Sequence, residues 1–181
     1  LKGSRLATKT LGRLLGMSLD PAHWNNILKS ELWELRQEET DILPALRLSY
    51  MYLPLHLKRC FAFCAVYPKD HRFNKITSAE FWVAEGFVVP EGNNLSLQHI
   101  GCQYFKNLVN WNFFQIFRGS YVIHDLMHDM AQLVSKDECF IIKNTSDFLK
   151  VPQNVRHLSI CPNSDVNCFD LLSLCTGSCA P

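Results

Sequence analysis

The stretch FFQIFRGSYVIHDLMHDMAQLV, residues 113–134, changes from the period of a strand to the period of a helix. Two β-prone runs, FFQIF and YVI, flank the short glycine-containing turn Arg118-Gly119-Ser120. Such runs around such a turn predict a two-stranded antiparallel hairpin. The residues that follow repeat apolar side chains every three to four positions, which predicts an amphipathic helix. We therefore expect a hairpin followed directly by a helix.

Three helices are predicted upstream of this hairpin. The first, LHLKRCFAFCAVY, follows Pro54 and is apolar nearly all round over residues 60–67, so it should be the most buried. The second, TSAEFWVAEGF, has Thr77 or Ser78 as its cap and Gly86 as its stop signal. The third is SLQHIGCQYFKNLVNW. Three helices followed by a hairpin are typical of a winged-helix unit.

The chain before this unit predicts a bundle of shorter helices. RLATKTLGRLLGM is the first, and the second restarts at Asp20-Pro21, with the aspartate as a cap and the proline at the first helical position. Trp24, Ile27 and Leu28 have the spacing of one buried face. The third is TDILPALRLSYMYL, capped by its first or second residue. Beyond the hairpin and its helix, CFIIK and VRHLSI predict isolated strands.

Composition and charge exclude several classes of protein. The 181 residues are 48% hydrophobic, which is normal for a packed core and too apolar for a disordered chain. Eighteen basic and 17 acidic residues give a formal net charge of +1, so the chain has no general attraction to nucleic acid or anionic membrane. No apolar run approaches the roughly 20 residues of a membrane-spanning helix. The chain begins at Leu1, and we expect it to be a piece of a longer protein or an incomplete gene product.

The cysteines favour buried free thiols over a disulfide scaffold or a zinc site. No C-x-x-C pair occurs, and a helix-rich chain of this length is unlike small disulfide-rich secreted domains. Cysteine is among the most often buried residues, so we expect core thiols in a reducing compartment. The eight are Cys60, Cys64, Cys102, Cys139, Cys161, Cys168, Cys175 and Cys179.

The helix after the hairpin carries the doublet His-Asp twice, as His124-Asp125 and His128-Asp129. Two histidines four residues apart on a helix can present both rings to one metal ion. The zinc signature H-E-x-x-H has glutamate after its first histidine, where this chain has Asp125, and no third ligand is placed nearby. An amphipathic helix with the histidines and aspartates off the apolar stripe is therefore the expected structure. The stripe consists of Ile123, Leu126, Met127, Met130 and Val134.

Other sites are excluded or left open by the motifs. The phosphate-binding patterns G-x-x-x-x-G-K-[ST] and G-x-G-x-x-G are absent, so any nucleotide pocket is completed elsewhere, and no G-x-S-x-G supports a hydrolase. A winged helix also suggests DNA binding. The predicted helix over residues 77–87 carries Glu80 and Glu85 without a lysine or arginine, which is the wrong sign for phosphates. A small basic cluster, Lys69, Arg72 and Lys75, precedes it.

Four stretches together resemble one family. LATKTLGRLLG, LPALRLSYMYLPLHLKRCFAFCAVYPKD, FWVAEGFV and YVIHDLMHDMAQ are similar, in order and spacing, to plant nucleotide-binding leucine-rich-repeat immune receptors of the coiled-coil class. The similarity lies in the C-terminal part of the NB-ARC module. It implies a mainly α fold, with a helical-bundle subdomain over residues 1–53 and a winged-helix subdomain with a small β-hairpin over residues 54–136. Residues 137–181 would be a linker and the start of a leucine-rich-repeat region, or a non-native tail.

The resemblance also implies two contacts with ADP. The family's G-L-P-L-A motif, which lies near the adenine, matches residues 3–7, so Leu6 is a ligand-binding candidate and Arg5 replaces the motif's proline. The family's Met-His-Asp motif matches Ile123-His124-Asp125. His124 would then contact the β-phosphate, and Asp125 would hold the local turn. The second doublet lies one turn too late and is expected at the helix surface or at a subdomain contact.

The resemblance predicts a regulatory role without enzymatic activity. The chain would be a fragment of a cytoplasmic plant immune receptor, carrying part of an ADP-binding switch in defense against pathogens. ADP or ATP would bind the full-length receptor, and this fragment would bind nucleotide weakly or not at all. Its partners would be the other subdomains of the same receptor and a self-oligomer formed on activation, with no nucleic acid. Two alternatives stay open: a winged-helix DNA-binding module and a non-functional remnant of a receptor gene.

Overall fold

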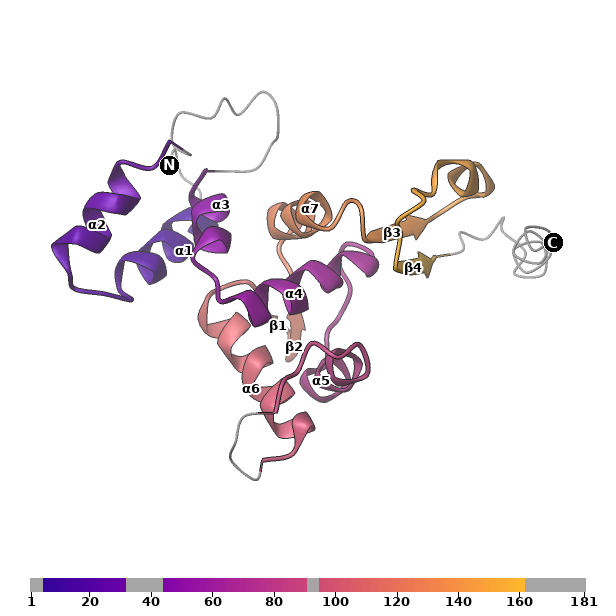
Figure 1. The fold of residues 1–181 in the computed structure, drawn as a ribbon, viewed down its shortest axis with the longest axis horizontal. Helices are drawn as coiled ribbons and strands as arrows, with labels where there is room; N and C mark the ends of the chain where they lie inside the picture. The colour runs from indigo at the N-terminus through magenta and orange to yellow at the C-terminus, as the bar shows by residue number, and fades with distance from the viewer. Residues whose placement is uncertain (1–4, 32–43, 91–94, 162–181) are drawn as a thin grey trace.

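The computed structural model describes residues 5–31, 44–90 and 95–161. The fold is mainly α, and Figure 1 shows α1 to α3 at one end, α4 at the centre, and β3 and β4 at the opposite end. The elements are α1 (Arg5–Leu15), α2 (Pro21–Leu28), α3 (Pro44–Met51), α4 (Leu55–Phe63), η3 (Cys64–Val66), α5 (Lys75–Ala84), α6 (Leu97–Asn110), β1 (Gln115–Phe117), β2 (Ser120–Val122), α7 (Asp125–Val134), β3 (Cys139–Ile142), η4 (Thr145–Lys150) and β4 (His157–Ile160). Within the described part of the chain, no helix is both long and apolar enough to cross a membrane.

The second helix begins where the sequence predicts. The Asp20 carboxylate accepts a hydrogen bond from the backbone N–H of Ala22, and proline occupies the first turn. The predicted buried face is wrong for two of its three residues, because only Ile27 is buried while Trp24 is 42% and Leu28 72% exposed. The indole N–H of Trp24 instead donates to the carbonyls of Leu15 and Ser18, 3.0 and 2.8 Å away. Trp24 therefore satisfies the carbonyl of the last residue of α1 and a carbonyl in the turn that follows it.

The third helix begins at Pro44, and the residues expected to cap it, Thr40 and Asp41, lie outside the described residues. The tail cysteines Cys168, Cys175 and Cys179 also lie outside them. The five cysteines that the structure describes are all free, and Cys60 and Cys64 are buried as expected.

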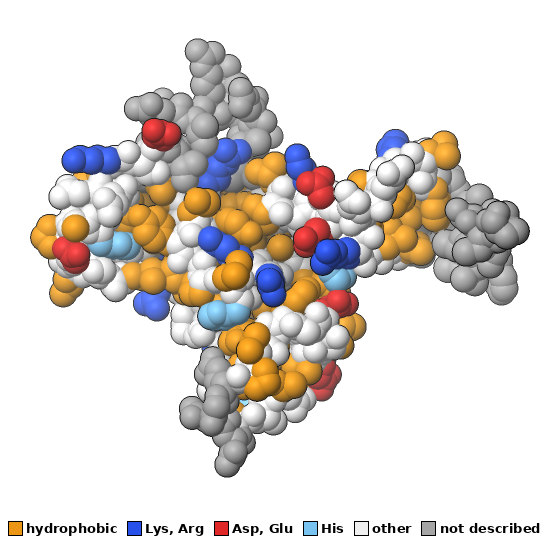
Figure 2. All heavy atoms as spheres, viewed as in Figure 1, with side chains coloured by type: hydrophobic (Ala, Val, Ile, Leu, Met, Phe, Trp, Pro, Cys, Tyr) orange, Lys and Arg blue, Asp and Glu red, His pale blue; other side chains and the backbone are white. Residues whose placement is uncertain are grey.

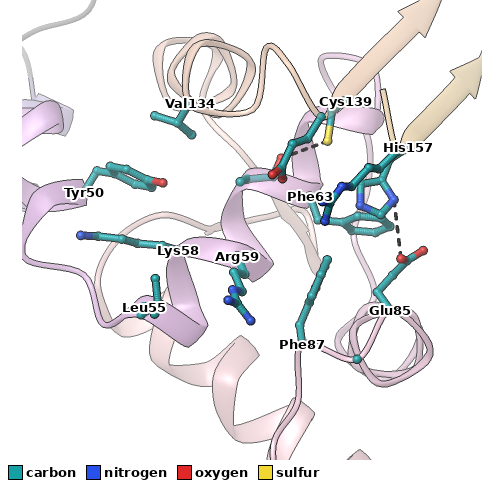
Figure 3. A pocket seen from close by; sticks show the side chains of 14 residues that line it. Tyr50, Leu55, Lys58, Arg59, Phe63, Glu85, Phe87, Val134, Cys139 and His157 are labelled. Carbon is teal, nitrogen blue, oxygen red and sulfur yellow. Dashed lines mark hydrogen bonds and ion pairs between the residues drawn. The ribbon is translucent and has the colours of Figure 1, made fainter. Parts of the chain in front are cut away.

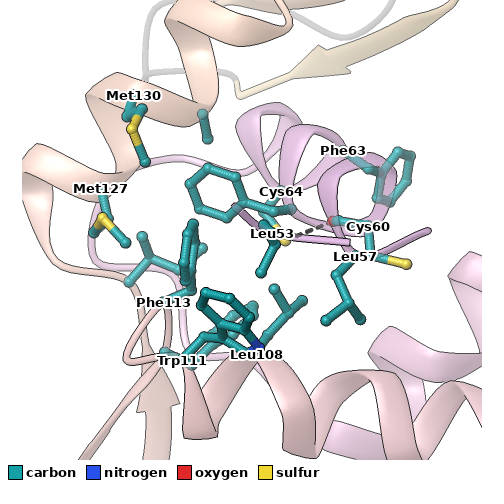
Figure 4. Packing of buried hydrophobic residues seen from close by; sticks show 14 of the residues in the cluster. Leu53, Leu57, Cys60, Phe63, Cys64, Leu108, Trp111, Phe113, Met127 and Met130 are labelled. Atoms are coloured by element: carbon teal, nitrogen blue, oxygen red, sulfur yellow. Dashed lines mark hydrogen bonds between the residues drawn. The ribbon is translucent and has the colours of Figure 1, made fainter. Parts of the chain in front are cut away.

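The core is built around α4 and η3. Nearly every residue from 60 to 66 is buried, which confirms the prediction from the continuous apolar run. The ring of Phe61 meets Phe113 edge to face, with centroids 4.7 Å apart. Figure 4 shows Cys60, Cys64 and Leu108 in the same cluster, and Met127 approaches from α7. The other elements of the winged-helix unit thus pack around α4, its first helix.

The helix α5 begins earlier than predicted. Asn74 is its cap, and its side-chain oxygen accepts from the backbone N–H groups of Ile76 and Thr77 at 2.9 and 3.2 Å. The prediction of Thr77 or Ser78 as the cap is therefore wrong. An asparagine oxygen that satisfies two orphan N–H groups outcompetes the hydroxyls one turn later. The predicted stop is confirmed, because Gly86 follows the helix at φ +72°.

The hairpin is present as a winged helix requires. Gln115 pairs with Val122 and Phe117 with Ser120 in antiparallel register. Arg118 and Gly119 both have positive φ, 48° and 77°, which is the conformation of a two-residue type I′ turn. The turn is thus one residue shorter than predicted, because residue 120 already belongs to β2.

The last two strands are not isolated, which corrects the prediction made for them. β3 and β4 pair in parallel, and the backbone N–H groups of Arg156 and His157 both donate to the Glu138 carbonyl at 2.9 Å. A parallel pair needs a crossover, and residues 143–156, which include η4, supply it. The sequence pattern cannot reveal this pairing, because each run alone is too short to specify a partner.

Candidate functional site

The first His-Asp doublet lies at the junction of β2 and α7. His124 is the residue that caps α7, and its Nδ1 accepts a hydrogen bond from the backbone N–H of Leu126 at 3.3 Å. In the neutral ring this bond assigns the proton to Nε2, which leaves an N–H donor available. Asp125 is the first residue of the helix, where its charge complements the helix dipole. Both side chains are exposed.

A shallow pocket of about 310 Å³ adjoins this junction, which we call the hairpin pocket. It brings the doublet together with the loop before α5 and with both strands of the hairpin. Its polar side chains include Arg72, His124 and the carboxylates of Asp70 and Asp125. The arginine, the histidine N–H and the helix N-terminus can each meet an anionic ligand, whereas the two carboxylates oppose one. The lining residues are Asp70, Arg72, Gln115, Phe117, Val122, Ile123, His124 and Asp125.

The second doublet faces inward. His128 is only 3% exposed, and its Nε2 lies 2.7 Å from the carbonyl oxygen of Tyr67. Asp129 forms an ion pair with Lys69, with 2.6 Å between Nζ and Oδ1. The expectation that all four residues lie off the apolar stripe is wrong for His128, because the end of η3 covers that face of α7 and supplies a polar partner there.

The two histidines do not converge on one point. His124 caps the exposed end of α7 and uses Nδ1 for that purpose, whereas His128 is buried and bonds a backbone carbonyl. Among the residues that the structure describes, no three or more histidine, cysteine, aspartate or glutamate side chains are grouped to hold a metal ion. The sequence spacing that suggests a shared metal therefore corresponds to two separate contacts.

The other predicted ligand-binding residue lies elsewhere. Leu6 is 5% exposed and belongs to the hydrophobic core, and its carbonyl accepts a hydrogen bond from the Thr10 hydroxyl at 2.8 Å. It does not line the hairpin pocket. Its contact with adenine remains a prediction. Of the motif around it, Gly3 and Ser4 lie outside the described residues, and Arg5 is exposed at the start of α1.

The basic cluster that suggests DNA binding is divided by the fold. Lys69 is neutralised by Asp129, Arg72 lines the hairpin pocket, and Lys75 begins α5. The helix directly before the hairpin is α6, which contains a single lysine, Lys106, and no arginine. On the face viewed in Figure 2, basic and acidic side chains are interspersed and form no continuous basic patch.

A second pocket has a volume of about 430 Å³, and we call it the α4 pocket (Figure 3). No pattern in the sequence predicts it. It lies between α4, the end of α5 and the start of β3 and β4. In it His157 approaches Glu85, with Nδ1 and Oε2 3.6 Å apart, and its ring meets Phe63 edge to face. Burial raises the pKa of the Cys139 thiol to about 11, so this thiol is a poor nucleophile at neutral pH. The lining includes Tyr50, Lys58, Arg59, Phe63, Glu85, Phe87, Cys139, Arg156 and His157.

The chain is similar to known proteins over most of its length. Residues 66–131 match the family model described as "Disease resistance protein Winged helix domain". The chain is 36% identical over 158 residues to putative disease resistance RPP13-like protein 1 of Arabidopsis thaliana. This match covers 87% of the chain and 15% of that protein. The chain is 43% and 42% identical over 134 residues to putative disease resistance protein RGA4 and disease resistance protein RGA2 of Solanum bulbocastanum. Those matches cover 71% of the chain and 14% of each protein, so the chain spans only a small part of these relatives.

Proposed function

Because this chain belongs to the plant disease resistance proteins and carries their winged helix domain, we propose that it forms part of a nucleotide-dependent switch in an immune receptor. In this proposal α1 to α3 belong to the helical subdomain of an NB-ARC module, and α4 to α7 form the winged-helix subdomain. The phosphate loop comes from another part of the receptor, because this sequence contains none. The ligand is ADP in the resting state.

The position of His124 carries the proposal. Its ring lines the hairpin pocket and uses Nδ1 to cap α7, so Nε2–H is the donor available for a phosphate oxygen. Arg72 in the same pocket supplies positive charge, and the N-terminus of α7 favours an anion. These features support contact with the β-phosphate of a nucleotide held by another domain.

The switch is a shift between two conformations. ADP binds the closed state better because His124 contacts its β-phosphate there, and exchange to ATP removes this difference. The winged helix then moves relative to the nucleotide-binding domain, and the receptor self-associates. The partners are the other domains of the same cytoplasmic receptor. The chain alone neither hydrolyses ATP nor holds ADP tightly, because most of the nucleotide contacts lie outside it.

The test uses the longest expressed protein that contains this chain. His124→Ala should lower the amount of ADP that copurifies or produce defense signalling without a pathogen. The matched control is His99→Ala, because His99 is also an exposed histidine near the start of a helix but lies on α6. Normal ADP retention and silence in the His124 variant would contradict the proposal.

A DNA-binding winged helix is the alternative in a different class. A gel-shift titration of the chain against duplex DNA at several salt concentrations separates the two. Tight DNA binding that weakens with salt, and is lost when Arg72 and Lys75 are replaced, would favour a DNA-binding function over the nucleotide-dependent switch.

A further inference from the structure

We propose that His128 and Asp129 are positioning residues that hold the loop of residues 67–72, so that Arg72 lies beside His124 as a second group for phosphate. The inference rests on the proposed function for the identity of the ligand. The positioning itself is a property of the chain without ligand. It gives the second doublet a role that differs from that of the first.

The bond of His128 fixes the start of the loop. Its Nε2 donates to the Tyr67 carbonyl at 2.7 Å, from a ring that is almost wholly buried. Its Nδ1 is also buried and has no hydrogen-bond partner among the described residues. Since an unpaired buried nitrogen costs stability, the 2.7 Å bond at Nε2 is the polar anchor of this ring among the described residues.

Asp129 holds the same stretch of chain two residues further on. Its carboxylate lies 2.6 Å from the Lys69 ammonium. The pKa of Lys69 is raised, chiefly by this hydrogen bond, and further by the charges of Asp129, Asp125 and Asp70. Lys69 therefore lies among the carboxylates of both doublets and offsets the repulsion between Asp125 and Asp129, which are one turn apart. An exposed ion pair contributes little alone, but here it acts beside a buried hydrogen bond.

The far end of the loop is held by the hairpin. The backbone N–H of Phe73 donates to the Tyr121 carbonyl on β2 at 2.8 Å. Between these anchors the chain turns tightly, because the His71 N–H donates to the Pro68 carbonyl and Asp70 adopts φ 65°. A loop pinned at both ends has few alternative conformations. Its backbone therefore stays where the fold places it, which sets the positions from which its side chains project.

The loop delivers two side chains to the hairpin pocket. Asp70 and Arg72 line it together with His124 and Asp125. Arg72 is exposed, and no ion pair occupies its guanidinium group among the described residues. A planar guanidinium binds phosphate through two parallel hydrogen bonds, which a lone histidine cannot do. His71 adds no charge at neutral pH, because burial lowers its pKa.

The first arm of the test needs no ligand. Amide hydrogen exchange is measured in the 181-residue chain at His71 and Phe73, whose N–H groups donate to the Pro68 and Tyr121 carbonyls. Asp129→Asn and His128→Leu should each speed exchange there about fivefold, because a local opening becomes easier. His128→Gln should keep wild-type exchange, because its amide nitrogen can donate to the same carbonyl. Asp137→Asn is the matched control on an exposed aspartate of the turn after α7.

Unchanged exchange in both Asp129→Asn and His128→Leu would overturn the positioning role. If His128→Leu fails to fold, Asp129→Asn and the His128→Gln rescue still decide it, because Asp129 is partly exposed and outside the core. A general rise in exchange across α7 in His128→Gln would also count against the proposal, because it would mean that the ring acts only by filling space.

The second arm measures ADP affinity by titration of the longest expressed protein that contains this chain. Arg72→Ala should lower ADP affinity about tenfold, the effect of one charge-assisted hydrogen bond. Asp129→Asn should lower it about threefold through the same loop. Arg13→Ala, on the exposed side of α1, should have no effect. If Arg72→Ala keeps full ADP affinity while His124→Ala clearly loses it, the role of Arg72 is overturned and the proposed function stands. If His124→Ala loses no ADP affinity, the proposed function itself is overturned.

Discussion

Gly101 of α6 lies so close to Ala79 of α5 that a Cβ built on the glycine would be 3.0 Å from the alanine Cβ and 3.2 Å from its carbonyl oxygen. The two helices therefore approach at a point where neither has a side chain longer than a methyl group. This contact sets the distance between the second and third helices of the winged-helix unit.

We expect Gly101→Ala to destabilise the protein by about 1–3 kcal/mol, because the added methyl meets helix backbone that cannot yield. Gly12→Ala is the control, because Gly12 is also helical and has nothing within 4 Å of the added Cβ. It should stabilise α1 by about 0.5–1 kcal/mol. Urea denaturation followed by circular dichroism measures both changes, and an equal effect at the two glycines would contradict the prediction.

The cap of α5 provides a second prediction. Asn74→Ala removes the acceptor of two backbone N–H groups and should cost about 1 kcal/mol. Asn74→Asp keeps an acceptor oxygen and should preserve stability within a few tenths of a kcal/mol. Thermal unfolding of the three proteins gives the comparison. Should the alanine variant melt with the wild type, the cap would lie elsewhere, for example at the hydroxyls that the sequence suggested.

The hairpin turn is built from an unfavourable residue. Arg118 adopts φ 48°, which an arginine disfavours and an asparagine tolerates. Arg118→Asn creates the Asn-Gly pair preferred in type I′ turns and should raise the free energy of unfolding by about 0.5 kcal/mol. Loss of the Arg118 contact with the Phe117 ring reduces this gain. The control is Arg13→Asn, which should lower stability slightly because asparagine is a poorer helix former.

The buried thiols predict a pH dependence of stability. The pKa of Cys139 rises from its usual value near 9.0 to about 11 through burial, so the unfolded chain releases this proton at lower pH than the folded one. The unfolded state therefore binds fewer protons between about pH 9 and 11, and the free energy of unfolding must fall across that window. Below pH 9 the thiol has no such effect. Denaturation of the wild type and of Cys139→Ala at pH 8 and 10.5 measures the difference, which should be smaller in the variant.

The same thiol predicts slow alkylation. At pH 8 iodoacetamide should modify Cys102 well before Cys139, because Cys139 is held in its thiol form. Peptide mass spectrometry of the folded protein distinguishes the two sites. Equal modification before unfolding would contradict the raised pKa of the half-buried Cys139 thiol.

Local signals allowed much of the fold to be predicted. The hairpin, the cap at Asp20 and the glycine stop after α5 depend on residues within a few positions of each other, and the structure confirms them. The cap of α5 was missed because Asn74, Thr77 and Ser78 all can cap, and only the three-dimensional end of the preceding loop selects one. Pattern alone cannot resolve such competition.

The site was less predictable than the fold. The family resemblance predicts a ligand contact for His124, whereas the burial of His128 depends on Tyr67, 61 positions away in the chain. Arg72 appeared only as part of a basic cluster, because nothing local says that its loop returns to the hairpin. Side chains that are brought together by residues distant in the chain leave no periodic pattern in a single sequence, so their contacts could not be predicted.

The aromatic rings of the winged-helix unit have a mechanical consequence. Phe73 meets Phe114 at 5.0 Å, Phe114 stacks on Phe105 at 4.7 Å, and Phe105 meets Tyr121 at 4.9 Å. The loop, α6 and the hairpin are thus wedged together by side chains that pack too densely to be compressed. We therefore expect the loop, α6 and the hairpin to keep their relative positions when the unit moves.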